Sequence, residues 1–439
     1  MSDSDWSRRR WLAAAAGVSG LGGPQDLPLL FDARAQGERR SGTPKADRPR
    51  SRQKISALKT TVVASPDAAL LNSYEVHETH FTRTIVELET SDGFKGLSEA
   101  RGGTAKAIEA ARDVMLGRDP FEIEYFRRNI SNIAAFGAIE VACLDVIGRI
   151  IDRRVVDLLG GAYREAARYS GYIFFVMPTP DGPDYSTPEA VAQLFTDFHR
   201  KYGFTSCKFK GGVLPPDKEI EALERMRAAH PEAKLRIDPN AGWSVETSVR
   251  VARALEPVKM EYLEDPTPGL DGMAEVRRQT KLPLATNMVV TKMEHVAPAL
   301  QKGSVDIILL DNHYMGGLNN VRYWAAICEA VGWGCSGHSN NHLGISMATM
   351  THMNCAISRV GYDADTHYPW TTEDVIKGPM LSFKDGTMAL PDAPGLGVEL
   401  DPDKLARLAE NVARIQSRDE LLKKWDPTRP AQSGRGIRF

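Results

Sequence analysis

Hydrophobic and polar residues alternate with two different periods along the chain, that of a β-strand and that of an α-helix. Residues 81–90 alternate as a β-strand does, and Ser91, Asp92 and Gly93 form a turn that leads into a second strand. Apolar residues recur at helical spacing over residues 104–116 and 137–151. The pattern therefore predicts a small α+β domain over residues 56–165.

Beyond residue 165 the pattern becomes a regular repeat. Short apolar runs each end in a polar residue, and helical patterns follow several of them, as over residues 219–229, 245–255 and 321–331. The run ends lie 28, 26, 23, 24 and 27 positions apart, the length of one βα unit; they are Lys210, Asp238, Glu264, Asn287, Asp311 and His338. This repeat predicts an α/β fold, a (β/α)-barrel over residues 166–400 with functional groups at the carboxyl ends of its strands. An open doubly wound sheet is the alternative, but no Gly-rich GxGxxG turn follows an early strand.

The N-terminus has the pattern of an export signal. Arg8, Arg9 and Arg10 precede Trp11 and Leu12, and an Ala/Gly-rich run covers residues 13–23. We interpret residues 1–35 as a twin-arginine signal peptide and residues 36–55 as a flexible linker. Because of this signal, we expect a periplasmic protein. The Ala/Gly-rich run is too short to span a bilayer, so we expect no membrane anchor after cleavage. A basic tail or an uncleaved anchor are the alternatives, and a non-functional signal would leave the protein in the cytoplasm.

Composition narrows the class of protein. The chain has 439 residues, 42% hydrophobic and 26% charged, and its 55 Lys+Arg against 57 Asp+Glu give a net charge of −2. This balance argues against a nucleic-acid binder, which usually carries a basic excess. Five scattered cysteines are too few for a disulfide scaffold or a CxxC metal site. An enzyme acting on a small molecule is the favoured class.

Oxygen-bearing side chains end three successive strands of the repeat. Asp238, Glu264 and Asn287 offer two carboxylates and one amide, which are hard ligands suited to Mg²⁺. Asp271 is a further carboxylate that could replace Glu264 as ligand. The sequence predicts a magnesium site at the barrel mouth.

Acid–base groups flank these oxygens along the chain. Lys208 and Lys210 lie two apart on one strand, so both side chains should enter the barrel mouth. A neighbouring cation and a divalent metal are both expected to lower the pKa of Lys210, which could then abstract a proton. Asp311 precedes His338 by one βα unit and is expected to hydrogen bond to it and fix its tautomer.

These residues, in this order, resemble the enolase superfamily. Within its mandelate racemase/muconate-lactonizing group, the sequence is most similar to the glucarate dehydratase branch. The resemblance covers about residues 70–430 and rests on the motifs 208–212 (KFKGG), 238–240 (DPN), 285–288 (ATNM), 338–342 (HSNNH) and 365–367 (DTH). It implies a modified (β/α)7β barrel with an N-terminal α+β capping domain, and a segment 401–439 that packs back on the cap.

The resemblance implies a Mg²⁺-dependent hydro-lyase of acid-sugar catabolism that dehydrates a sugar diacid. Lys210 and the His338–Asp311 pair would be bases on opposite faces of the α-carbon, and Lys208 would position Lys210. His80 and Arg83 would lie on a cap loop that closes over the substrate. The expected substrate-binding residues in the rest of the chain are Asn240, Tyr172, Phe174, Ser339, His367 and Arg418. A homo-oligomer is expected.

Two other functions remain open. The same metal-binding and acid–base residues could serve an epimerase, a racemase or a dehydratase of another aldarate or sugar acid. An inactive periplasmic ligand-binding protein with the same barrel is the alternative from another class.

Overall fold

The computed structural model describes residues 53–73, 75–77, 80–179, 182–417, 420, 423 and 437–439. The predicted signal peptide (1–35), nearly all of the predicted linker (36–55) and Arg418 lie outside the described residues. In the described part of the chain, no helix has both the length and the apolar character needed to cross a bilayer.

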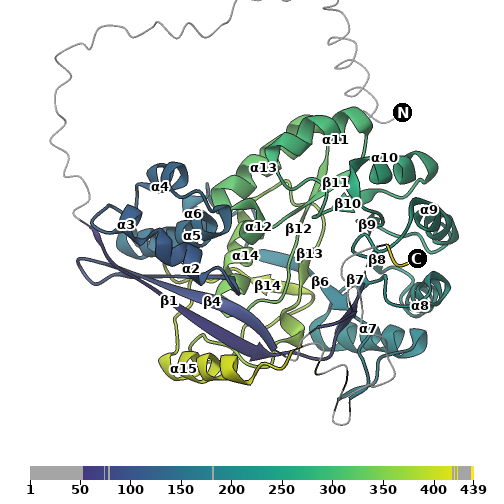
Figure 1. The fold of residues 1–439 in the computed structure, drawn as a ribbon, viewed down its shortest axis with the longest axis horizontal. Coiled ribbons are helices and arrows are strands. Elements are labelled where there is room, and N and C mark those ends of the chain that lie inside the picture. The colour runs from purple at the N-terminus through teal and green to yellow at the C-terminus, as the bar shows by residue number, and fades with distance from the viewer. Residues whose placement is uncertain are drawn as a thin grey trace, which may run out of the picture. The chain divides into compact units, whose positions relative to one another are not determined.

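A three-stranded antiparallel sheet with helices on it forms the cap (Figure 1). Its strands, in the order β1-β4-β5, are β1 (Ile55–Pro66), β4 (His80–Thr90) and β5 (Lys95–Arg101). Between β1 and β4 in the chain lie two short strands, β2 (Leu71–Asn72) and β3 (Glu75–Val76), which pair with each other. The helices of this part are α2 (Ala105–Ala110), α3 (Arg112–Met115), α4 (Ile123–Asn129), α5 (Ile133–Ile151) and α6 (Val155–Leu158).

The helix α5 holds the cap together. It begins where the Asn132 side chain accepts a hydrogen bond from the Ala135 amide, and it ends at Asp152 in a left-handed conformation. It packs closely on β5, because a Cβ on Gly96 would lie 2.2 Å from the carbonyl oxygen of Ala142. Only glycine allows that approach.

The strand predicted at 81–90 and the helix predicted at 137–151 are present. The helix predicted at 104–116 is instead two short helices, α2 and α3, with a break at Ala111. The amides of Ala111 and Val114 bond to carbonyls three residues earlier, so the chain tightens there and the α-helical ladder stops.

Eight parallel strands form the barrel, in the order β12-β11-β10-β9-β8-β7-β6-β13. A bridge between Cys335 and Val360 brings the two ends of this sheet together, so the barrel is nearly closed. The strands are β6 (Ala166–Ile173), β7 (Ser206–Lys210), β8 (Lys234–Asp238), β9 (Tyr262–Glu264), β10 (Leu284–Thr286), β11 (Ile307–Leu310), β12 (Gly334–Gly337) and β13 (Ala364–Thr366). An antiparallel strand, β14 (Thr387–Ala389), pairs with β6.

Helices connect the strands and surround them (Figure 1). They are α7 (Pro188–Tyr202), α8 (Pro216–Ala229), α9 (Val245–Ala254), α10 (Gly269–Gln279), η2 (Met293–His295) with α11 (Val296–Lys302), α12 (Asn312–Met315) with α13 (Leu318–Val331), and α14 (Gly344–Ala356). Seven helical connections between eight strands confirm the expected (β/α)7β barrel. The short η3 (Tyr368–Trp370) follows β13.

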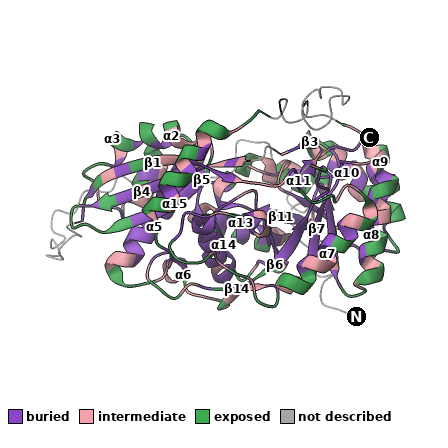
Figure 2. Cartoon of the chain, turned by 90° about the horizontal axis from the view of Figure 1, so that it is seen from below, coloured by how far each residue is buried: buried purple, intermediate pink, exposed green. Residues whose placement is uncertain are grey.

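Alternation along the barrel strands separates two layers of side chains. All five residues of β7 are buried, as Figure 2 shows for the barrel strands in general. Cys207 faces the helices, where its Sγ lies 3.9 Å from Sδ of Met226. Lys208 and Lys210 have the opposite parity and face the barrel mouth, where they bind carboxylates.

The first part of the C-terminal segment lies against the cap sheet, as expected, but its last described residues, 437–439, instead bond to Gly242 and Ser244 in the barrel loop after β8. Helix α15 (Pro402–Glu410) and the following η4 (Asn411–Arg414) pack on β1. The side-chain amide of Asn411 donates a hydrogen bond of 3.2 Å to the carbonyl oxygen of Ala64 in β1. Residues more than 340 positions apart are therefore tied together across the cap.

Candidate active site

A cleft of about 870 Å³ opens at the carboxyl ends of the barrel strands. Barrel residues, among them Lys210 and His338, form one part of its lining. Cap residues, among them His77 and Arg101, form another. The cleft therefore lies where barrel chemistry and cap residues meet, as expected for a (β/α)-barrel enzyme.

Lys208 joins three carboxylates at the floor of this region. Its Nζ lies 2.7 Å from Glu264 Oε1, 2.8 Å from Asp365 Oδ2 and 3.4 Å from Asp238 Oδ2. The Lys208 side chain is fully buried, and burial alone would lower its pKa. The carboxylates of Asp365 and Glu264 outweigh burial and raise the pKa of Lys208 well above its ordinary value. Lys208 is a fixed cation that positions these acids.

Lys210 lies beside Lys208 and contacts the cleft. Its Nζ donates to Asp238 Oδ2 at 2.6 Å and to the Tyr172 hydroxyl at 3.1 Å. Burial and Lys208 act to lower the pKa of Lys210, but the Asp238 carboxylate and the Tyr172 phenol outweigh them and raise it. The predicted lowering of the Lys210 pKa is therefore wrong where only the charges of the protein act, because the charge nearest to Lys210 is a carboxylate.

The three predicted oxygen donors converge. Lys208 touches both Asp238 and Glu264, and the Asn287 side-chain amide lies 3.1 Å from Glu264 Oε1. Burial acts to raise the pKa of Asp238, but Lys210 and Lys208 lower it to about 2. Burial and Asp238 raise the pKa of Glu264 well above its ordinary value. One acid is held charged beside another that is costly to ionise.

The donor set fits a hard divalent cation. Among the described residues, Glu264 Oε2 is buried and has no hydrogen-bond partner. A buried carboxylate oxygen without a partner is costly, and a bound cation satisfies it. Two carboxylates and an amide oxygen are also the ligand types that Mg²⁺ prefers. Asp238, Glu264 and Asn287 are the residues that would hold the ion.

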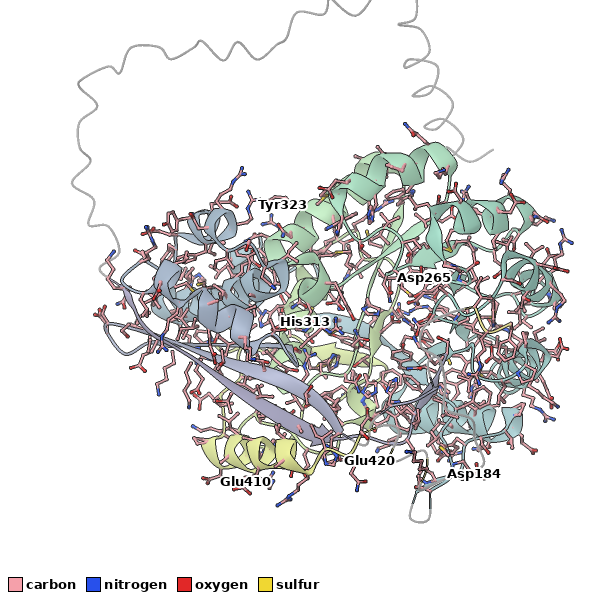
Figure 3. The ribbon with its side chains drawn as sticks, viewed as in Figure 1. Asp184, Asp265, His313, Tyr323, Glu410 and Glu420 are labelled. Carbon is pink, nitrogen blue, oxygen red and sulfur yellow. The ribbon has the colours of Figure 1, made fainter. Side chains whose placement is uncertain are left out.

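Asp265, labelled in Figure 3, is a site residue that was not predicted from the sequence. Its carboxylate accepts hydrogen bonds from the Thr286 hydroxyl at 2.5 Å and from the backbone N–H of Asn287 at 2.8 Å. Asp265 therefore fixes the strand end that carries Asn287. Burial raises its pKa to about 7. Its position directly after Glu264 was the only signal in the sequence.

Asp271 does not compete with Glu264. It lies in the first turn of α10, its side chain is 86% exposed, and it pairs with Lys302. This exposed helix position is outside the group of buried donors at the strand ends.

His338 and Asp311 form a hydrogen-bonded pair across β12 and β11. The distance from His338 Nδ1 to Asp311 Oδ2 is 2.8 Å, and the His313 amide donates to Asp311 Oδ1 at 2.7 Å. Burial acts to raise the pKa of Asp311, but the hydrogen bond from His338 lowers it to about 2. The charged Asp311 accepts a hydrogen bond from the Nδ1–H group of His338, and Nε2 of His338 is then the nitrogen available to the cleft.

Four of the predicted substrate-binding residues line the cleft: Tyr172, Phe174, Asn240 and His367. The rings of Tyr172 and Phe174 lie 4.4 Å apart between their centroids and form an aromatic wall. Burial lowers the pKa of His367 to about 4, so its imidazole is neutral at physiological pH.

The other predicted substrate contacts lie elsewhere. Ser339 is buried, its hydroxyl accepts the His367 amide at 3.2 Å, and it is absent from the described lining of the cleft. His80 begins β4 opposite Pro66 and is likewise absent from that described lining. Arg418 lies outside the described residues.

Arg83 is not on a cap loop, contrary to expectation. It is buried within β4 and pairs with Glu99 of β5 at 2.6 Å. Glu99 also accepts the Leu343 and Ser346 amides, both at 2.8 Å, at the start of α14. Arg83 Nη2 lies 3.2 Å from Nε2 of His313, labelled in Figure 3. Two cap strands thus reach the segment that follows Asp311, a contact that the local sequence does not reveal.

A lysine and an aspartate-supported histidine face one cleft beside clustered oxygen donors, which defines an acid–base enzyme built on a (β/α)7β barrel. Family models agree with this class. The N-terminal domain of mandelate racemase/muconate lactonizing enzyme matches residues 59–160, and the enolase C-terminal domain-like family matches residues 190–404. The chain belongs to the enolase superfamily, in the mandelate racemase/muconate lactonizing enzyme group.

Relatives over nearly the whole described chain support this placement. A probable glucarate dehydratase of Streptomyces coelicolor is 40% identical over 409 residues, 83% of this chain and 94% of the relative. The crystal structure of an enolase from Mycobacterium smegmatis complexed with tartrate has a TM-score of 0.83 at 40% identity, covering 89% of this chain and 99% of that one. An enolase from Pseudomonas fluorescens with bound magnesium, potassium and tartrate has a TM-score of 0.83 at 36% identity, covering 88% and 99%.

Proposed function

We propose that this protein is a Mg²⁺-dependent hydro-lyase that dehydrates a sugar diacid of the glucarate type to a keto-deoxy acid. The observation that carries the proposal is that Lys210 and His338 line one cleft with Asn287, one of three converging oxygen donors. The similarity to a probable glucarate dehydratase supports the reaction, and the solved relative with magnesium and tartrate supports a hydroxylated diacid as substrate.

The donor set gives the substrate carboxylate its place. Asp238, Glu264 and Asn287 would hold Mg²⁺, which when bound supplies positive charge that binds the substrate carboxylate, acidifies its α-proton and lowers the pKa of Lys210. Lys208 keeps Asp238 and Glu264 together through its contacts with both. Asp265 keeps Asn287 in register with them.

The chain's own groups then move the protons. Lys210 or His338 takes the proton from the α-carbon, and the electron pair of that C–H bond forms the double bond to the β-carbon. The β-hydroxyl takes a proton from Nε2 of His338 in its imidazolium form and leaves as water, while the Nδ1–H group of that ring stays hydrogen-bonded to Asp311 at 2.8 Å. The resulting enol tautomerises to the keto acid. Tyr172, Phe174 and Asn240 line the space for the polyol chain.

Epimerisation at the same carbon is the second candidate. It requires one base on each face of the α-carbon, and the cleft has Lys210 from β7 and His338 after β12. A dehydratase uses the same two groups but adds expulsion of the β-hydroxyl. Product analysis separates the two reactions.

The experiment is a panel of hexarates and related sugar acids incubated with the purified protein and Mg²⁺. Formation of a keto acid from D-glucarate is the expected result, and loss of that product in His338→Asn, which removes the proton donor to the β-hydroxyl, checks that the cleft is responsible. Inversion of the α-carbon without a keto acid would instead support an epimerase. Turnover of another aldarate with no reaction of glucarate would reassign the substrate.

We also propose that the protein is exported by the twin-arginine route and acts in the periplasm as a homo-oligomer. The pattern of Arg8 and Arg9 before Trp11 and Leu12 supports the export route.

A further inference from the structure

Asp365 is a fully buried carboxylate in β13 that the proposed reaction does not use. Its side chain is 0% exposed, and it begins the motif at residues 365–367 (DTH). A buried carboxylate is costly unless it is paired with a cation or hydrogen-bonded. The partners of Asp365 therefore indicate what it does.

Two cations of the barrel interior lie beside Asp365, one at each carboxylate oxygen. Oδ2 accepts a hydrogen bond of 2.8 Å from Lys208 Nζ, and Oδ1 lies 3.5 Å from Arg236 Nη1. Within the described part of the chain, Oδ1 has no hydrogen-bond partner. Arg236 has a closer partner in Glu261, at 2.6 Å. Lys208 is therefore the cation that Asp365 binds most directly.

Asp365 changes the balance of charge around the two lysines at the barrel mouth. Lys208 also contacts Glu264 at 2.7 Å and Asp238 at 3.4 Å. Lys210 contacts Asp238 at 2.6 Å. These five side chains are at most 7% exposed, so salt and water screen their charges little. Two ammonium groups thus face three carboxylates, and one negative charge is left over for a bound cation.

Without the charge of Asp365, the two lysines would have only two carboxylates as partners. Lys208 would then rely on Asp238 and Glu264, the acids that are expected to bind the metal ion. An ammonium group that competes for these oxygens weakens cation binding, and so does the loss of the excess negative charge. Both effects have the same sign, which fixes the direction of the expected change.

We propose that Asp365 is a positioning residue of the predicted magnesium site and acts through Lys208. It takes up the charge of Lys208, so that the oxygens of Asp238 and Glu264 are free to bind the ion. Asp365 is absent from the described lining of the cleft, so its influence on the site passes through another residue. The inference rests on the Mg²⁺ dependence of the proposed function and adds a residue that supports it.

The test is a calorimetric titration of the full chain with Mg²⁺, in the absence of substrate. Asp365→Asn should weaken Mg²⁺ binding about 10- to 100-fold, the range for residues that support metal ligands. Asp365→Glu keeps the charge and should bind Mg²⁺ more tightly than Asp365→Asn does.

The matched control is Asp363→Asn, two residues earlier in the chain. The Asp363 carboxylate is also buried, but it pairs with Arg168 at 2.9 Å and accepts a hydrogen bond of 2.8 Å from the Ser206 hydroxyl. Because its side chain binds these groups rather than Lys208, the variant should bind Mg²⁺ as the unchanged protein does. Circular dichroism and urea unfolding of each variant separate a weakened site from a lost fold.

Equal Mg²⁺ affinity in Asp365→Asn and the unchanged protein would overturn the proposal. An equal loss in Asp363→Asn would also overturn it, because the effect would then be common to buried acids of this strand. An equal loss in Asp365→Glu would show that the charge is not the cause. If the unchanged protein bound no Mg²⁺, the magnesium site would be refuted and this inference with it, whereas a wrong assignment of the reaction would affect neither.

Discussion

The chemistry of this site depends on which partner each titratable side chain meets. Asp311 and His338 were predictable from sequence because residues after adjacent parallel strands end at one rim, and they lie 2.8 Å apart. The charge state of Lys210 was not predictable in the same way. Its pKa depends on Asp238 at 2.6 Å, and strand spacing alone does not say which carboxylate a lysine reaches.

Asp311→Asn tests the histidine pair. The substitution keeps the shape but removes the charge that fixes the His338 tautomer, so kcat should fall about 100- to 10,000-fold, the range for general acid–base catalysis. KM should change little, and steady-state kinetics measure both. The matched control is Asp306→Asn, directly before β11 at its other end, where the carboxylate pairs with Arg277. Equal kcat values for the two variants would contradict the assigned role.

The same residue predicts a pH dependence of stability. The pKa of Asp311 falls from 3.8 to about 2 on folding, so its contribution is complete above 3.8 and is lost as the pH falls toward 2. The unfolding free-energy difference between the unchanged protein and Asp311→Asn should be about 1 kcal/mol smaller near pH 3 than near pH 6. Urea unfolding at the two pH values measures it. A difference that grows on acidification would show the opposite sign.

Among the elements, the cap sheet and α14 are joined by the Glu99 carboxylate, which also forms a buried ion pair within the cap. Glu99 binds Arg83 on the neighbouring strand and accepts two amides at the start of α14, which follows His338 in the chain. The negative carboxylate lies where a helix N-terminus favours it. This contact orients the cap on the barrel next to the acid–base pair.

Glu99→Ala should destabilise the protein by about 3–5 kcal/mol, because it leaves the Arg83 guanidinium buried without its partner. The matched control is Glu87→Ala on β4, whose pair with Lys59 is exposed and should contribute about 0–1 kcal/mol. Urea denaturation of both variants gives the comparison. Similar losses in the two would mean that the Glu99 contact does not join cap and barrel.

The element pattern was predictable where the period was long and regular. The polar residues Lys210, Asp238 and Glu264 do end β7, β8 and β9, because a buried strand terminates where polar side chains reach the mouth. The break at Ala111 was not predictable, since apolar spacing runs through it and the tight turn depends on backbone bonding. The placement of Arg83 depends on how β4 and β5 dock on α14, which joins residues 244 positions apart.

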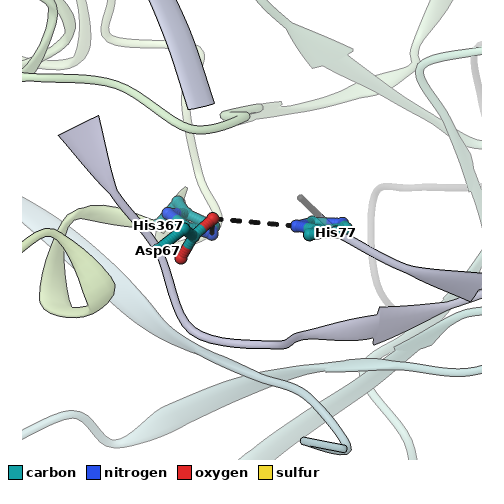
Figure 4. A group of neighbouring side chains, drawn as sticks. All are labelled: Asp67, His77 and His367. Atoms are coloured by element: carbon teal, nitrogen blue, oxygen red, sulfur yellow. Dashed lines mark ion pairs between the residues drawn. The ribbon is translucent and has the colours of Figure 1, made fainter. Parts of the chain in front are cut away.

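At the scale of the whole molecule, the cap and barrel are two parts of one enzyme. The repeat of βα units indicated the barrel, and its (β/α)7β form followed from the family resemblance. The sequence pointed to His367 but did not show that its side chain lies near those of Asp67 and His77, as Figure 4 shows. The three residues lie in two cap segments and one barrel strand end, and no motif spacing links them.

Export of the chain is tested at this same scale. A reporter fused to residues 1–40 should reach the periplasm, and replacing Arg8 and Arg9 by lysine should abolish its export, because the twin-arginine route requires the pair. Arg10→Lys is the matched control and should leave export intact. Reporter activity in periplasmic fractions measures all three. Export that persists without Arg8 and Arg9 would refute the twin-arginine assignment.

The most direct test of the account is exchange of the substrate α-hydrogen in D₂O with Mg²⁺, for sugar diacids that differ only in configuration at that carbon. We expect the unchanged protein to exchange both epimers. Lys210→Ala should lose exchange of one epimer, and His338→Asn should lose exchange of the other. If both variants lose the same epimer, or both keep exchange of both, the two groups do not act as bases on opposite faces of one carbon.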